Sequence, residues 1–200
     1  MRVSETVFEY VDLGLPSGTL WASCNVGATK PEECGDYFAW GETKPKDDYC
    51  GHNYKWQWLG SDKVTKYCCN EGWGIVDGKR ELDFKDDAAF VNWGADWLMP
   101  SSFQIKELID FCTWTWTQLN GVYGQRVVGV NGNFIFLPAT FSRHVSDHQE
   151  VSSFFYGSYL SRTLSLCDGL CFNLFFNSNS VGEDVSSRLS GYPVRPVRMK

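Results

Sequence analysis

Apolar and polar residues alternate near both ends of the chain, which indicates short β-strands there. Residues 11–13 and 20–22 alternate on either side of a Pro-Ser-Gly turn, as two strands joined by a tight connection do. The last such segment is GYPVRPVR (191–198), in which Pro193 and Pro196 lack a backbone N–H. We therefore expect this strand at a sheet edge or a bulge.

Helical periodicity occurs in two segments in the middle of the chain. DFKDDAAFVNWG (83–94) predicts a short helix with acidic residues at its N-terminus. A second helix is expected after Ser101, because Ser101 and Gln104 have the spacing of a capping box. Its buried stripe is predicted to contain Phe103, Leu108 and Phe111, with Ile105 and Ile109 nearby.

Apolar and polar residues alternate again after Cys112, which indicates further strands. TWTWTQ places Trp114 and Trp116 on one face of a strand, and the next two strands join across the Asn131-Gly132 turn. Residues 44–80 show no periodicity, so we expect long loops held by aromatic side chains. Strands at both ends with helices between them predict a single α+β domain over residues 1–200.

Composition excludes several functions. The formal charge of −6 disfavours nucleic acid as a partner, because phosphate binding requires clustered Lys and Arg. No apolar run approaches the ~20 residues that span a bilayer, so direct membrane insertion is not expected. The first residues, MRVSETVFEYVDLG, lack the apolar core of a signal peptide. Eight cysteines suit neither a disulfide scaffold nor a typical reduced protein, and a disulfide through Cys68 or Cys69 is expected.

The C-terminal third uses a restricted set of residues. Residues 159–192 contain no Trp, Lys, Met or Gln, although the preceding part of the chain contains all nine tryptophans. Lys is normally common on exposed loops, yet none occurs between residues 107 and 199. The composition of a Ser- and Asn-rich surface loop would account for the missing Trp and Met, but not for the missing Lys.

Long motifs of the chain resemble one protein family. The segments YVDLGLPSGTLWASCNVGATKPEECGDYFAWGETKPK, WLMPSSFQIKELIDFCTWTWTQLNGVYGQRVVGVNGNFIFLPAT and GYPVRPVR resemble the Fibrobacter succinogenes major paralogous domain, a family of exported bacterial proteins. WLMPSSFQIKEL is also similar to a signature of the C-type lectin fold. The resemblance implies a C-type lectin-like fold with two helices, small antiparallel sheets, long loops and paired terminal strands, YVDLGL beside PVRPVR.

Within this fold, the resemblance also implies a variable protein of a diversity-generating retroelement. Such an element copies a template with errors at adenines, and a mutated Asn codon cannot then encode Trp, Lys, Met, Gln or Glu. Glu183 is the one exception in residues 159–192. Leu174, Phe176 and Val181 suit inward strand positions, and Arg188 and Arg195 hold the family spacing. A variable ligand-binding region is therefore expected at residues 141–192.

The expected ligand contacts combine aromatic anchors, charges and adaptable polar groups. The predicted binding residues are Arg143, His144, Asp147, Tyr156, Tyr159, Ser161, Arg162, Thr163, Ser165, Asp168, Phe175, Glu183, Asp184, Ser186, Ser187, Leu189 and Ser190. The expected partner is a protein or glycan receptor, bound without catalysis, and the expected location is a cell surface or the exterior of a phage particle.

Metal sites and enzyme chemistry are weaker interpretations. His144 and His148 have a metal-ligand spacing, but their segment is not convincingly helical. Cys50, His52 and the Cys68–Cys69 pair are zinc-ligand types, although adjacent cysteines seldom reach one tetrahedral centre. The calcium-binding strings of C-type lectins are missing, so no metal or cofactor is expected.

Two other functions stay open. The first is an adhesin or pilus-tip domain of the same family with an invariant ligand. The second is an oxidase related to formylglycine-generating enzymes, which share the fold and use a cysteine pair; Cys167 and Cys171 would then react. Asp168 beside them would raise their pKa, so this interpretation is weaker.

Overall fold

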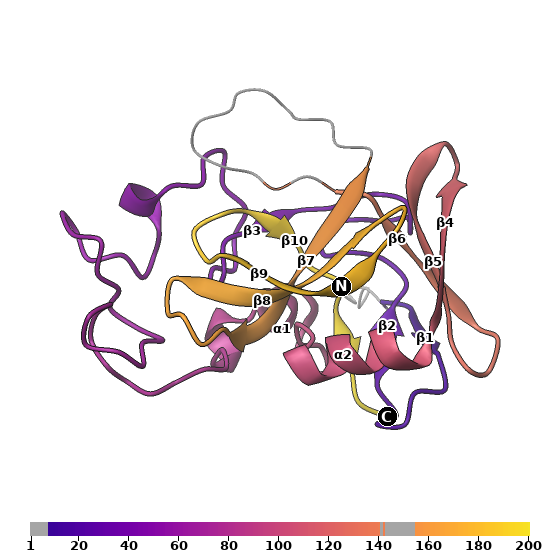
Figure 1. Ribbon diagram of the computed structural model, residues 1–200, viewed down its shortest axis with the longest axis horizontal. Coiled ribbons are helices and arrows are strands. Elements are labelled where there is room, and N and C mark those ends of the chain that lie inside the picture. Colours follow the sequence, from indigo (N-terminus) through magenta and orange to yellow (C-terminus); the bar gives the residue numbers. More distant parts are fainter. Residues whose placement is uncertain (1–7, 141, 143–154) are drawn as a thin grey trace, which may run out of the picture.

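The computed structural model describes residues 8–140, 142 and 155–200. The described residues form two α-helices and eleven short strands, and the strands make four small antiparallel sheets (Figure 1). The predicted α+β class is therefore confirmed. Within the described part of the chain, no helix combines the length and the apolar character that crossing a bilayer requires.

The two ends of the chain meet in one sheet. β2 (Leu20–Ala22) lies between β1 (Tyr10–Asp12) and β11 (Val197–Arg198), with Trp21 paired to both Val11 and Val197. The expected pairing of the 10–15 segment with the C-terminal strand is therefore wrong. All three residues of β2 are buried, so this apolar segment takes the central position and the other two strands take the edges.

The first predicted helix is interrupted. A 3₁₀ turn, η2 (Phe84–Asp86), precedes α1 (Ala88–Trp93), and Asp87 between them has extended backbone angles. The Asp87 carboxylate accepts hydrogen bonds from the Ala89, Phe90 and Met99 amides. A buried N-cap therefore replaces the continuous helix that the sequence predicted.

α2 (Ser102–Phe111) begins where predicted, with the Ser101–Gln104 capping box formed. Its buried stripe differs, because Phe103 is 82% and Phe111 48% exposed. Leu108 is fully buried, as predicted, and Ile105 is also fully buried, while Ile109 packs against the same apolar cluster. These three positions are i, i+3 and i+4 and so share one helix face, whereas Phe103 points away.

A three-stranded meander follows, formed by β4 (Thr113–Leu119), β5 (Val122–Val128) and β6 (Phe134–Pro138). Asn120 and Gly121, both with positive φ, make the tight first turn. Trp114 and Trp116 lie on one face, as predicted, with ring centroids 6.2 and 6.5 Å from that of Phe176. The predicted hairpin around Gly132 is also confirmed.

The C-terminal third forms the sheet of β7 (Tyr156–Leu164), β8 (Leu170–Asn177) and β9 (Val181–Ser187), which crosses the centre of the molecule (Figure 1). One of its faces packs Tyr159, Leu174 and Phe176 into the cluster that contains α2. The other packs Leu160 and Cys171 against Trp40 and Trp97 in a second cluster. The middle of this sheet is therefore buried on both sides.

The segment 44–80 forms loops around aromatic side chains, as predicted, with one short 3₁₀ turn, η1 (Gly51–Asn53). The ring of Tyr67 packs edge to face with Trp40 at a centroid distance of 5.1 Å and with Trp56 at 5.7 Å. β3 (Tyr37–Phe38) pairs with β10 (Tyr192–Pro193) and joins this region to the C-terminal segment.

Candidate binding face

The structure divides the predicted binding residues into buried and accessible groups. The predicted surface role is wrong for five residues, which are at most 3% exposed: Tyr159, Ser161, Ser165, Asp168 and Ser190. Arg143, His144 and Asp147, together with the His144–His148 pair, lie outside the described residues.

Tyr159 is a core residue. Its ring stacks on Phe176 at 5.9 Å, and its hydroxyl donates a 2.7 Å hydrogen bond to the Pro138 carbonyl. Burial raises the pKa of Tyr159 well above its ordinary value. Ser161 is equally enclosed, and its carbonyl accepts a 3.0 Å hydrogen bond from the Trp40 indole.

Asp168 anchors a distant loop. One of its carboxylate oxygens accepts hydrogen bonds from the backbone amides of Cys69 (2.9 Å) and Asn70 (2.8 Å) and from the Cys68 thiol (3.5 Å). Ser165 shapes the turn before it, because its hydroxyl bonds both the carbonyl and the amide of Cys167. Ser165 therefore stabilises a local turn, whereas Asp168 stabilises backbone that the sequence alone does not place near it.

The accessible residues converge on one end of the β7–β9 sheet. Phe175 pairs with Gly182 in the β8–β9 register, and Asp184 and Ser186 follow at alternate positions, so all four lie on one sheet face. Tyr156 stacks on Phe175 with ring centroids 5.9 Å apart. We call Tyr156, Phe175, Gly182 and Asp184 the outer face of the sheet. Ser186 lies farther along β9, opposite the fully buried Cys171.

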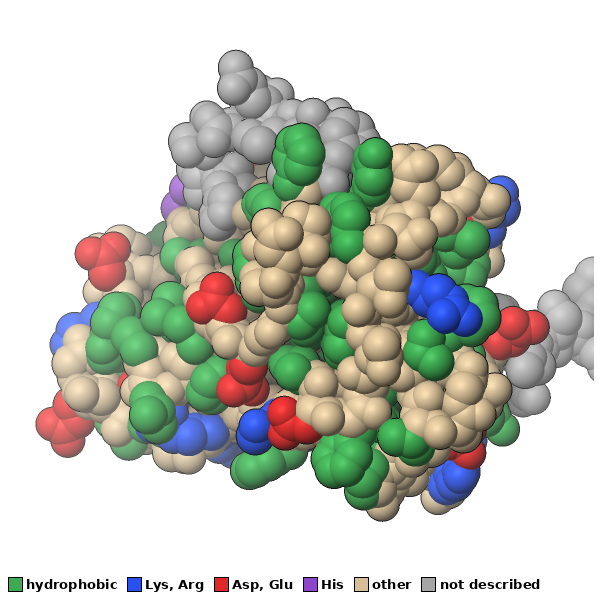
Figure 2. All heavy atoms as spheres, turned by 45° about the vertical axis from the view of Figure 1, so that its right-hand side comes forward, with side chains coloured by type: hydrophobic (Ala, Val, Ile, Leu, Met, Phe, Trp, Pro, Cys, Tyr) green, Lys and Arg blue, Asp and Glu red, His purple; other side chains and the backbone are tan. Residues whose placement is uncertain are grey.

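Gly182 shows how open this face is. A Cβ atom placed there would meet no other atom within 4 Å. A Cβ at Gly157, by contrast, would overlap the ring of Phe176. In the space-filling view, apolar side chains are scattered among backbone and uncharged polar atoms, and charged side chains occur singly or in small groups (Figure 2). Sequence reasoning did not single out Gly182, because a partly exposed glycine in a strand has no signal of its own.

The other accessible candidates lie elsewhere. Glu183 is on the opposite face of β9, where burial raises its pKa and the charge of Lys106 on α2 opposes that rise. Ser187 shares that face. Arg162 and Thr163 are both bound to Glu81, at 3.0 and 2.5 Å. Leu189 packs against a third apolar cluster. Its side chain also lies next to Gly51, because a Cβ atom added to that glycine would be 3.9 Å from it.

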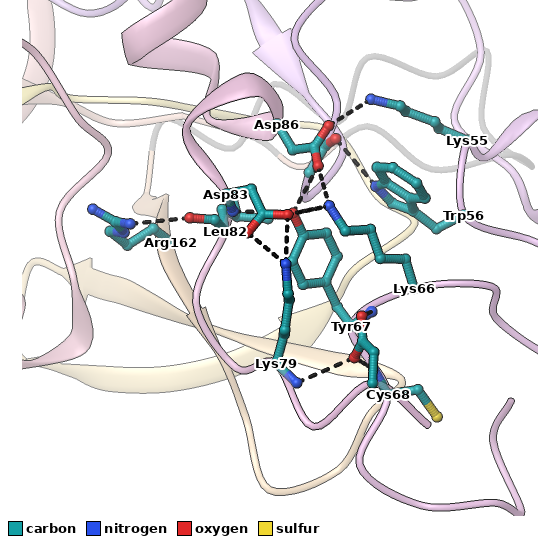
Figure 3. Close-up of polar contacts among 12 residues, drawn as sticks. Lys55, Trp56, Lys66, Tyr67, Cys68, Lys79, Leu82, Asp83, Asp86 and Arg162 are labelled. Atoms are coloured by element: carbon teal, nitrogen blue, oxygen red, sulfur yellow. Dashed lines mark hydrogen bonds and ion pairs between the residues drawn. The ribbon is translucent and has the colours of Figure 1, made fainter. Parts of the chain in front are cut away.

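A polar cluster beneath the loops was missed by sequence reasoning. The Lys66 ammonium lies between the carboxylates of Asp83 (2.5 Å) and Asp86 (2.6 Å), and the Tyr67 hydroxyl donates to Asp86 at 2.7 Å (Figure 3). Burial alone would lower the pKa of Lys66, but these hydrogen bonds outweigh it and raise the pKa. Lys66 is therefore a protonated structural cation, and burial raises the pKa of Tyr67 to about 12.

Arg188 holds the same loops from the C-terminal side. Its guanidinium is 1% exposed and donates to the Tyr54 hydroxyl and the Tyr67 and Asp168 carbonyls at 2.9 Å, and to the Lys66 carbonyl at 3.2 Å. Arg195 is similarly buried and bonds Asn25 and three backbone carbonyls. Both arginines are therefore buried structural cations that fix backbone from several parts of the chain.

The cysteines correct one expectation and weaken another. Cys68 and Cys69 carry free thiols, so the predicted disulfide through this pair is wrong. Cys167 and Cys171 are also free thiols, and burial raises the pKa of Cys171 to about 12. A thiol with so high a pKa is a poor nucleophile at neutral pH.

The structure thus defines an α+β domain of small antiparallel sheets, with partly exposed side chains at one end of the C-terminal sheet. Comparisons with protein-family models, curated proteins and solved structures gave no match.

Proposed function

We propose that this chain is a non-catalytic receptor-binding domain with a C-type lectin-like fold, whose outer face contacts the ligand. The fold proposal is supported by the two helices, the long loops and the terminal segments that share one sheet. The binding proposal rests on one observation: Asp184 is exposed and Tyr156, Phe175 and Gly182 are partly exposed, while Tyr159, Leu174 and Phe176 on the opposite side of β7 and β8 are packed into the core.

The residues of this face suit recognition. Tyr156 and Phe175 form a stacked pair, and such rings bury a large area at a small cost in conformational entropy. Asp184 supplies a negative charge for electrostatic complementarity. The expected partner is a protein or glycan receptor on another surface, reached from a cell surface or a phage particle.

We further propose that these positions vary under a diversity-generating retroelement. The open space at Gly182 supports this idea, because side chains of many sizes fit there. Variation is expected at Tyr156, Phe175, Gly182 and Asp184, and not at buried positions such as Tyr159. Sequencing the locus from sibling genomes tests this, and an invariant outer face would favour the invariant adhesin instead.

Binding is tested with arrays of surface proteins and glycans probed with the full chain. Once a receptor is found, Tyr156→Ala and Phe175→Ala should each weaken binding by at least about tenfold, the effect of losing ~1.4 kcal/mol. Phe103→Ala is the matched control, because this exposed ring lies on α2. Equal losses for all three variants would contradict the assignment of the face.

The oxidase alternative has less support. It needs a reactive thiolate, whereas Cys171 is fully buried with a pKa of about 12. An assay of peptide-cysteine oxidation by the parent chain, with Cys167→Ser as the control, decides this alternative. Activity that disappears in the variant would replace the binding proposal.

A further inference from the structure

Three potential metal ligands converge at the start of the 48–62 loop. Asp48, Cys50 and His52 alternate along the chain, and their donor atoms all lie within 4.8 Å of one another. The Cys50 sulfur lies 3.3 Å from Asp48 Oδ2 and 3.2 Å from His52 Nε2. The thiol is buried, whereas the carboxylate and the imidazole are exposed.

The backbone around these side chains is fixed by Asn53. Its side-chain oxygen accepts hydrogen bonds from the Cys50 amide (3.3 Å) and the Lys46 ammonium (3.0 Å), and its amide group donates to the Asp48 carbonyl (3.0 Å). These contacts tie both ends of the 48–53 segment together. The three donors are therefore held close together by residues that are not themselves ligands.

The donor set is selective. Thiolate and imidazole are ligands of zinc-class cations, whereas calcium and magnesium prefer oxygen alone. Zinc bonds of about 2.0–2.3 Å in a tetrahedron require donor atoms roughly 3.3–3.8 Å apart. The two short distances from the Cys50 sulfur are already close to that range.

We propose that Asp48, Cys50 and His52 bind one zinc-class divalent cation and leave its fourth coordination position open. His52 also lines a pocket of about 320 Å³, together with Gln57, Ser61 and Asp62. The fourth ligand is therefore water or a donor atom of a small molecule in this pocket. Asp48 replaces the Cys68–Cys69 pair that the sequence offered, because the Cys68 thiol bonds Asn70 and Asp168 instead.

The test uses the chelator-treated, reduced full chain, titrated with Zn²⁺ against a chromophoric competitor and separately with Co²⁺. We expect one Zn²⁺ per chain, and for Co²⁺ a thiolate charge-transfer band with the visible spectrum of a tetrahedral site. His52→Ala and Asp48→Asn should each lower Zn²⁺ affinity by at least about 100-fold, because loss of even an outer partner costs about 10–100-fold.

Cys69→Ser is the control, since it removes a free thiol that is not part of the cluster and should leave affinity unchanged. Cys50→Ser should abolish the cobalt charge-transfer band; if it does not fold, the exposed Asp48 and His52 variants decide the question. The proposal is overturned if the parent chain does not bind Zn²⁺, if His52→Ala binds it as tightly as the parent, or if Cys69→Ser loses as much affinity. No receptor is involved, so the result is independent of the proposed function.

Discussion

Replacement of Arg188 by Met is the sharpest test of how the C-terminal segment is attached to the rest of the fold. Met keeps much of the side-chain volume but removes all four hydrogen bonds of the guanidinium. It also removes the stacking of the cation on Trp40 and Tyr54, at 5.0 and 5.4 Å.

The magnitude follows from the groups left behind. The Tyr67 and Asp168 carbonyls and the Tyr54 hydroxyl lose a buried donor, and each such loss costs about 1–3 kcal/mol. The Lys66 carbonyl is part-buried and can regain water, so we count three losses near the lower end of that range. The expected destabilisation is about 3–5 kcal/mol, a large share of the roughly 5–15 kcal/mol that stabilises a typical domain.

Urea unfolding followed by tryptophan fluorescence measures the change in the free energy of unfolding, and a thermal melt gives a second measurement. At about 2–4 °C per kcal/mol for a chain of this size, the melting temperature should fall by roughly 6–20 °C. Arg126→Met is the control, because Arg126 is only partly buried and stacks on the exposed ring of Phe134. A loss below about 1 kcal/mol for Arg188→Met, or an equal loss for Arg126→Met, would refute the reasoning.

Two further predictions concern the C-terminal sheet and the polar cluster. Gly157→Ala should lower the free energy of unfolding by about 1–3 kcal/mol, because the added Cβ overlaps the ring of Phe176. Gly182→Ala should change it by no more than about 0.5 kcal/mol. Equal unfolding midpoints of the two variants in urea would contradict this contrast. The hydrogen bond from Lys66 holds the pKa of Asp83 at about 2, below its unfolded value near 3.9. The contribution of ionised Asp83 to the free energy of unfolding is therefore complete above about pH 4 and is lost as the pH falls toward 2. Because the Asp83 side chain is about one-third exposed, we expect this contribution to be about 1 kcal/mol. Urea midpoints between pH 6 and 2 should show this loss, and Lys66→Met should reduce it; an unchanged pH dependence in the variant would exclude the pair as its source.

Local signals in the sequence predicted local structure well. The Ser101–Gln104 capping box located α2, and the Asn131-Gly132 turn located a hairpin, because both depend on residues a few positions apart. The stripe of α2 was misassigned at Phe103 and Phe111, since large apolar side chains were assumed to be buried.

Long-range contacts explain the remaining errors. Asp168 looks like a surface residue in the sequence, yet it is buried because it bonds amides about a hundred positions away. Ser161 is buried for a similar reason, since Trp40 reaches its carbonyl from another part of the chain. The alternating Asp48, Cys50 and His52 were visible in the sequence, but the adjacent cysteines at 68 and 69 drew attention to a different combination.

Burial of the middle of the β7–β9 sheet on both sides has a genetic consequence under the proposed function. Mutagenesis that struck every codon of this segment would mostly yield chains that fail to fold, because residues 157–161 are all buried whereas residues 183–185 are exposed. An efficient template would carry mutable adenines at the codons of the outer face and lack them at those for Tyr159 or Asp168. The size of the repertoire is then set by one end of a small sheet and not by the length of the rewritten segment.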